Sequence, residues 1–238
     1  MQNAAPVRTS ALLTSLGWLD HAFLPAGIAP PEEIACGHQR HSPTVVMSEE
    51  AFPRKQREAD GVIATDSRPV AVYTADCLPV LIADTRQHHV AAVHAGLKGA
   101  LAGVLPAAVN RLLALGATPE SLFVAIGPAI APCCYELGQD VLETITSDPR
   151  VTAPQWFSTQ PINPHAVRPQ AEAKNQGIWF DLPALGRQML LDMKIPAAQI
   201  EVLPVCTYCS AEPQSSYRRN AHFSDGYALR YSWIQRRT

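Results

Sequence analysis

Three short apolar segments follow one another between residues 70 and 94, and they constrain the fold more than any other feature of the chain. Residues 70–74, 79–84 and 88–94 are rich in apolar and β-branched side chains, and only short polar or turn-like stretches separate them. This spacing is typical of β-strands that lie close together. From Gly99 onward the period changes to that of a helix, and Gly116 is placed to end it.

The remaining segments alternate between strand-like and helix-like patterns. Asp181 and Pro183 mark the start of a second long helix over residues 180–195, as N-cap and first-turn residue. The expected strands elsewhere are 44–47, 122–130, 200–205 and 227–234, the last with the alternation of a half-buried edge strand; 138–146 is an expected short helix, and 48–61 and 151–177 are expected loops. Because strands occur in clusters as well as between helices, the pattern predicts an α+β sandwich.

Composition narrows the class of function. A chain of 238 residues that is 47% hydrophobic can bury one large core, so we expect residues 1–238 to form a single catalytic domain. The formal net charge of -2 argues against nucleic acid as a partner. No apolar run reaches the length of about 18 residues that a membrane span needs, and the N-terminus lacks a signal-like apolar stretch. We therefore expect a cytoplasmic monomer or homodimer with a small-molecule substrate and no membrane partner.

Cys77 and His94 occur where the apolar segments end. If these segments are neighbouring strands, both side chains emerge at one edge of the sheet, near the start of the following helix, whose amide groups would lower the pKa of the thiol. Lys98, in the loop expected before that helix, adds positive charge. A cysteine and a histidine form either a nucleophilic pair or two legs of a metal site. His41 is the candidate third ligand, and a His-Cys-His set with an open position is typical of catalytic zinc.

The other cysteines are weaker candidates. Six cysteines are too few for a disulfide scaffold in a chain of this length. Cys206 and Cys209 have the spacing of a metal-binding pair, but no second such pair occurs. A four-thiolate site that recruits the adjacent Cys133 and Cys134 is therefore not expected, and all four are left outside the predicted metal site.

Five segments resemble, in the same order, the laccase-domain family, also called the YfiH-like or polyphenol oxidase family. They are "TADCLPVLIAD", "AAVHAGLKGALAGVL", "AIGPAIAPCCYELG", "FDLPALGRQML" and "CTYCSAEPQSSYRRN". The resemblance runs from about Gln39 to the C-terminus and implies an α/β/β/α sandwich of the kind found in putative cysteine hydrolases. It also implies that His41 of a Gln-x-His motif, Cys77 and His94 are the metal-binding and catalytic residues.

The chain departs from the usual family pattern at positions that would contact substrate. An N-terminal Phe-Ser-Thr-Arg segment is replaced by "HAFLPAGIAPP", and Leu97-Lys98 stands where Trp-Arg is common. The pair Arg218-Arg219 is kept. We expect Asp76, Lys98, Arg218 and Arg219 to contact the substrate, with phosphate held next to the ribose by these cations.

The resemblance implies one site but not one substrate, because several different reactions are described for the family. A thiolate with two imidazoles suits zinc, so we expect a zinc-dependent enzyme that cleaves purine nucleosides with phosphate and deaminates adenosine. Copper is possible at the same ligands, since it binds such sites tightly. The alternatives are a copper-dependent polyphenol oxidase, a Cys/His amidase that edits a peptidoglycan precursor, and a non-catalytic metal-binding protein.

Overall fold

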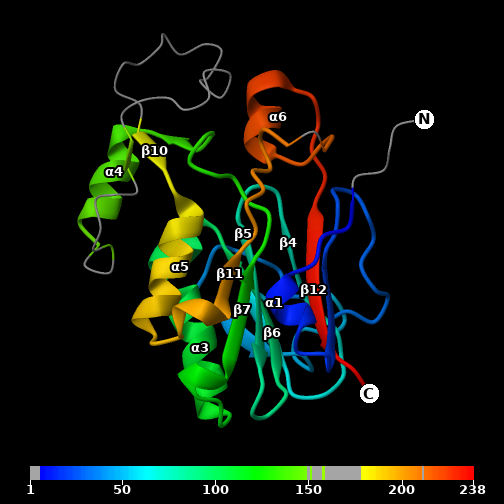
Figure 1. Ribbon diagram of the computed structural model, residues 1–238. Coiled ribbons are helices and arrows are strands. Elements are labelled where there is room, and N and C mark those ends of the chain that lie inside the picture. The colour runs from blue at the N-terminus through cyan, green and yellow to red at the C-terminus, as the bar shows by residue number, and fades with distance from the viewer. Residues whose placement is uncertain (1–5, 149–150, 152–156, 159–177, 211) are drawn as a thin grey trace.

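The computed structural model describes residues 6–148, 151, 157–158, 178–210 and 212–238, and Figure 1 shows how its elements are arranged. The loop predicted over residues 151–177 lies outside the described residues except at positions 151, 157 and 158. The helices are α1 (Ala11–Thr14), α2 (Leu97–Ala102), α3 (Val104–Ala114), α4 (Gln139–Thr146), α5 (Leu182–Asp192) and α6 (Tyr217–Phe223), with short 3-10 turns η1 (Pro119–Ser121) and η4 (Ala197–Gln199). The strands are β1 (Leu19–Phe23), β2 (Val45–Met47), β3 (Gly61–Ala64), β4 (Val70–Thr74), β5 (Leu78–Asp84), β6 (Val90–Ala95), β7 (Leu122–Ile126), β8 (Glu136–Leu137), β9 (Phe157–Ser158), β10 (Ile178–Phe180), β11 (Ile200–Val202) and β12 (Arg230–Arg236).

The large sheet has the strand order β11-β7-β5-β6-β3-β2. Each of its central strands β7, β5, β6 and β3 is antiparallel to the next, and the outer strands β11 and β2 each pair in parallel with a neighbour. All residues of β5 and β6 are buried. Both faces of this sheet are covered, which explains why these strands read as continuous apolar runs rather than as an alternating pattern.

Helices α3 and α5 cover one face of the large sheet (Figure 1). Val80 and Ile82 of β5 point to this face and pack with Leu105 of α3 and Leu185 of α5. Helix α5 begins as predicted, because the Asp181 carboxylate accepts a hydrogen bond from the backbone N–H of Ala184 at 2.9 Å.

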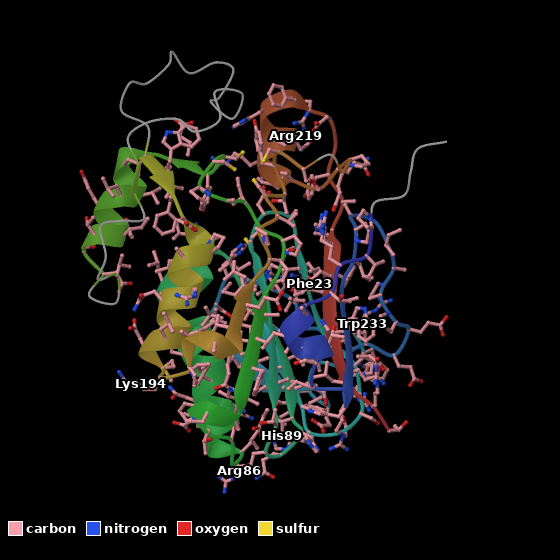
Figure 2. The ribbon with its side chains drawn as sticks, in the orientation of Figure 1. Phe23, Arg86, His89, Lys194, Arg219 and Trp233 are labelled. Atoms are coloured by element: carbon pink, nitrogen blue, oxygen red, sulfur yellow. The ribbon has the colours of Figure 1, made fainter. Side chains whose placement is uncertain are left out.

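The small sheet, ordered β1-β12-β4, packs against the other face. Phe23 of β1 and Ile234 of β12 pack in one core with Leu81 of β5. Leu81 lies between Val80 and Ile82, whose side chains face the helices on the other side of the sheet. Trp233 lies on the outer face of the small sheet, where it packs against the irregular segment that contains Ile34 and Cys36 (Figure 2). The predicted α+β sandwich is thus confirmed, with irregular chain covering this part of the outer face.

Two details of the prediction are wrong. The helix expected as one piece from Gly99 is broken into α2 and α3, because Gly103 adopts a left-handed conformation with φ 92°. Strand β12 is the central strand of the small sheet rather than an edge strand. Its alternating burial arises because one side of that sheet faces the core and the other is only partly covered.

None of the helices in the described part of the chain combines the length and the apolar character that crossing a membrane requires.

Candidate functional site

The turn between β4 and β5 carries Asp76 and Cys77, and here the chain passes from the small sheet to the large one. In the antiparallel pair of β5 and β6, Pro79 lies opposite His94. Cys77, two residues before Pro79, therefore comes close to His94 at one end of the pair. The expectation that Cys77 ends a strand adjacent to that of His94 is wrong, because β4 and β6 belong to different sheets and Cys77 precedes β5.

The end of the molecule that carries the site follows from the course of β5 and β6, together with residues labelled in Figure 2. Arg86 lies shortly after the end of β5, and His89 lies directly before the start of β6. Both residues are at the opposite end of the molecule from Arg219 of α6. Cys77 and His94 lie at the other ends of the same two strands, which places them toward α6.

The structure brings together the three residues that the sequence singled out as metal ligands. The ligand atoms of His41, Cys77 and His94 all lie within 4.8 Å of one another, and Cys77 Sγ is 3.7 Å from His41 Nε2. The two imidazole rings meet edge to face, with centroids 4.8 Å apart. A tetrahedral zinc ion separates a sulfur ligand from a nitrogen ligand by about 3.6 Å, so this spacing fits zinc.

Asp60 organises the site, and sequence reasoning missed it. Its buried carboxylate accepts hydrogen bonds from the backbone N–H groups of Arg40, His41 and Ser42, at 3.1, 2.9 and 2.8 Å, and from the Ser42 hydroxyl. The same carboxylate lies 2.8 Å from Nδ1 of His94, which leaves Nε2 of that ring free to bind a metal. Burial alone would raise the pKa of Asp60, but these hydrogen bonds hold it well below its usual range.

Two further residues fix the positions of the ligands. The Gln39 side chain accepts a hydrogen bond from the Tyr73 backbone N–H at 2.8 Å and donates one to its carbonyl at 2.7 Å, which fastens the His41 loop to β4. Gly96 leaves room for the ligands, because a Cβ there would lie 2.6 Å from Cys77 Sγ and 2.8 Å from His41 Cδ2. Gln39 belongs to the recognised Gln-x-His motif, whereas the need for glycine at position 96 appears only in three dimensions.

The pKa values of the Cys77 thiol and of the exposed His41 imidazole are shifted in opposite directions. Burial raises the pKa of the Cys77 thiol to about 12, and the carboxylates of Asp76 and Asp60 add to this rise. The expectation that the nearby helix start would lower this pKa is therefore wrong. Burial, and then the neighbouring His94, lower the pKa of His41, so its imidazole is neutral at neutral pH and able to donate a lone pair to a cation.

A pocket of about 320 Å³ opens beside the three ligands. Its volume lies at the lower end of the range of about 300–1,000 Å³ that is usual for small-molecule sites. Among the described residues, no group pairs with the buried hydroxyl of Thr74, which is part of this pocket. The rings of Tyr217 and Tyr227 meet edge to face with centroids 5.2 Å apart. The lining consists of Gln39, His41, Tyr73, Thr74, Ala75, Cys77, His94, Tyr217, Tyr227 and Leu229.

The residues expected to contact substrate lie around this pocket but do not line it. The buried Asp76 carboxylate accepts hydrogen bonds from Thr207 Oγ1 at 2.6 Å, Ser216 Oγ at 3.0 Å and the Arg218 backbone N–H at 2.7 Å. Burial raises its pKa even though these hydrogen bonds oppose the rise. Asp76 thus joins the Cys77 turn to the start of α6.

The three cations expected to contact substrate, Arg218, Arg219 and Lys98, differ in the protein groups that they contact. The Arg218 guanidinium donates to the Glu136 carbonyl at 2.7 Å, and that of Arg219 pairs with Asp225 at 2.7 Å. Lys98 is exposed in the first turn of α2, not in a preceding loop as expected, because α2 already begins at Leu97. It lies near enough to His41 to lower the pKa of that imidazole.

Comparisons with known proteins identify the family of the chain and agree with its fold. A family model described as multi-copper polyphenol oxidoreductase laccase matches residues 21–235. A relative from Synechocystis sp., named purine nucleoside phosphorylase, is 37% identical over 174 residues, which cover 68% of this chain and 63% of that protein. A relative from an unknown prokaryotic organism, named adenosine deaminase, is 29% identical over 197 residues, which cover 79% of this chain and 70% of that protein. The chain thus spans less than two thirds of the length of the first of these relatives.

The crystal structure of the hypothetical protein YfiH from Bacillus licheniformis has the same fold. It superposes with a TM-score of 0.78, covers 98% of this chain and 99% of that one, and is 22% identical in sequence. This likeness confirms the predicted α+β sandwich, in which the large sheet and the sheet β1-β12-β4 are packed together with helices.

Proposed function

The chain belongs to the multi-copper polyphenol oxidoreductase laccase family, and on that premise we propose that it is a zinc-dependent enzyme acting on purine nucleosides. The proposed reactions are cleavage of adenosine- and inosine-type nucleosides with phosphate, and deamination of adenosine. Relatives named for both activities support this proposal. The observation that carries it is the gathering of His41, Cys77 and His94 at the mouth of a pocket that contains three tyrosine rings.

The proposed metal ligands are His41, Cys77 and His94, which offer two nitrogens and one sulfur. Zinc bound there would act as a Lewis acid that activates water or helps to orient phosphate. Two features of the chain fit this ion: the Asp60 carboxylate on Nδ1 of His94, and the space that Gly96 leaves between the thiol and the imidazole. Copper can bind the same donors, and the tests below include it.

The pocket supplies groups suited to a nucleoside. The exposed rings of Tyr217 and Tyr227 offer aromatic faces on which a purine can stack. They would take the role of the Trp that is common in the family where this chain has Leu97. The buried Thr74 hydroxyl offers a hydrogen bond to a ribose hydroxyl or a ring nitrogen. The Asp60 carboxylate holds the His94 imidazole in one orientation.

A product assay tests the proposed function. Purified protein of measured metal content is incubated with adenosine or inosine, with and without phosphate, and the products are separated by chromatography. We expect adenine or hypoxanthine together with ribose 1-phosphate only when phosphate is present, and inosine from adenosine without it. If none of these products forms with zinc fully bound, the proposed activity is wrong. Oxidation of a phenol by copper-loaded protein would then favour the oxidase alternative.

Lys98 is the proposed contact for phosphate, because it is an exposed cation in the turn that follows the metal ligands. We expect Lys98→Ala to lower phosphorolysis about tenfold, the loss of one charge-assisted hydrogen bond of about 1.5 kcal/mol. Deamination needs water rather than phosphate and should fall less, and zinc content should not change. Steady-state rates for both reactions provide the measurement.

The matched control for Lys98 is Lys194→Ala. Lys194 is also an exposed lysine, and it follows α5 at a distance from α6, as Figure 2 shows. Neither reaction should change in this variant. Equal losses of both reactions in Lys98→Ala, or no loss, would contradict the assignment and direct attention to Arg218 and Arg219.

A further inference from the structure

Four cysteines that play no part in the site described above come together at one place. Cys133 and Cys134 lie in the segment between β7 and β8, and Cys206 and Cys209 lie in the segment after β11. Their four Sγ atoms all lie within 4.8 Å of one another. From the sequence alone these residues are not expected to bind a metal, because one Cys-x-x-Cys pair has no second pair to complete a site.

The topology of the large sheet explains why they meet. Strands β7 and β11 are parallel neighbours, so the chain leaves both of them at the same end of the sheet. Beyond the strands the two segments stay paired, because the Ala129 N–H donates to the Val205 carbonyl at 3.2 Å and the Thr207 N–H donates to the Ala129 carbonyl at 3.0 Å. This pairing carries Cys133 and Cys134 toward Cys206 over a long separation in sequence.

The sulfur–sulfur spacing fits a tetrahedral metal. Zinc with four thiolates at about 2.3 Å places the sulfur atoms about 3.8 Å apart. In the structure Cys133 Sγ lies 3.8 Å from Cys209 Sγ and 3.5 Å from Cys134 Sγ. None of the four cysteines is part of a disulfide in the structure.

The surroundings of the four cysteines help to hold them in place. The Ala131 backbone N–H donates to Cys206 Sγ at 3.4 Å. The side chains of Ile130, Trp179 and Tyr208 form an apolar cluster with the buried Cys134, and Cys133 and Cys206 pack against this cluster. Cys209 is exposed.

We propose that Cys133, Cys134, Cys206 and Cys209 form a second metal site that binds one structural zinc ion through four thiolates. Closed four-sulfur sites of this kind hold loops together and leave no position for a substrate. Here the metal would fasten the segment after β7 to the segment after β11.

This second site is linked to the first through Asp76. The Ile130 backbone N–H donates to the Asp76 carbonyl at 2.9 Å, and the Thr207 hydroxyl donates to the Asp76 carboxylate at 2.6 Å. One donor comes from each of the two segments that the metal would hold. The second zinc therefore supports the turn that carries Cys77, without being a part of the pocket.

Metal counting on four proteins tests the proposal. All four proteins are produced with excess zinc and purified under reducing conditions. The number of zinc ions per chain is then measured by elemental mass spectrometry. We expect two zinc ions per chain in the wild type and one in Cys77→Ala. We also expect one in the double variant Cys206→Ala/Cys209→Ala. Cys36→Ala is the matched control, because Cys36 is a free cysteine outside both groups, and it should keep two.

X-ray absorption on Cys77→Ala reports the remaining site alone. We expect four sulfur neighbours at about 2.3 Å around zinc. Removal of that zinc by a chelator should lower the thermal midpoint of this variant by at least about 5 °C, since a bound metal stabilises only the folded state.

Several outcomes would overturn the second site. They are a single zinc ion in the wild type that is lost in Cys77→Ala, an unchanged zinc content in the double variant, a shell of mixed nitrogen and sulfur in Cys77→Ala, iron in place of zinc, or disulfides among the four cysteines in the purified protein. None of these measurements depends on enzymatic activity. A failed nucleoside assay with two zinc ions bound would therefore count against the proposed function and not against this site.

Discussion

A Gly96→Ala substitution is expected to lower the affinity of the His41, Cys77 and His94 site for zinc by at least about 100-fold. The added Cβ would lie 2.6 Å from Cys77 Sγ and 2.8 Å from His41 Cδ2, so both ligands have to move. Displacement of ligands by about 1 Å is enough to disable a site of this kind. The backbone at Gly96 has φ -68°, which alanine adopts without strain, so the effect is steric and the protein should stay folded.

The control for this substitution lies three residues further along the chain. A Cβ at Gly99 would meet the backbone of His41 at 3.6 Å, an ordinary contact, and alanine is the better helix former within α2. Gly99→Ala should therefore bind zinc like the wild type and be at least as stable. Competition with a chromophoric chelator measures the affinity, and thermal unfolding checks the fold. Wild-type affinity in Gly96→Ala would mean that the metal is not held by Cys77 and His41.

Asp60→Asn is expected to lower zinc affinity 10- to 100-fold, the usual loss when the partner of a metal-binding histidine is changed. The amide replaces one accepting oxygen by a donor. This donor then faces either the His94 ring and the His41 N–H, or the N–H groups of Arg40 and Ser42. The variant should also unfold at a lower temperature, because buried donors lose their acceptor.

The stability that Asp60 contributes has a defined pH window. Its pKa is lowered in the folded state, so the contribution is complete above the unfolded value near 3.9 and is lost only as the pH falls through the lower folded value. The contribution of the Asp60 carboxylate to the difference in unfolding free energy between wild type and Asp60→Asn should therefore shrink only as the pH falls below about 4. Glu58→Gln is the control: it makes the same chemical change on an exposed side chain paired with Arg40, and it should alter neither stability nor affinity. Similar losses in both variants would contradict the positioning role of Asp60.

The gathering of the three candidate metal ligands could be predicted in large part from the sequence, because two of them lie next to regular structure. Cys77 and His94 flank strands whose two buried faces make them continuous apolar runs, and such runs are easy to recognise. Asp60 was missed because an aspartate before a glycine at the end of a polar segment has the pattern of a solvated turn residue. Its importance comes from a hydrogen bond to His94, distant in sequence, and no local pattern indicates that contact.

The same limit applies to the strand arrangement and to the cysteines. The alternation in β12 was interpreted as an edge strand because partial cover by irregular chain leaves the same pattern as exposure to solvent. The four clustered cysteines meet only because β7 and β11 are parallel neighbours, although the elements β8, α4, β9, β10 and α5 lie between these two strands along the chain. The composition of a segment predicts that it forms a strand, whereas the strand that lies beside it in the sheet depends on packing across the whole chain.

The passage of the chain from one sheet to the other at Asp76 and Cys77 divides the pocket into two walls. Cys77 and His94, at the ends of β5 and β6, form one wall from the large sheet. Tyr73 and Thr74 of β4, with Tyr217 of α6, form the other. Tyr217 of the second wall belongs to a helix that carries neither Cys77 nor His94. The side chains that shape one half of the pocket are thus supplied by different elements from those that hold Cys77 and His94.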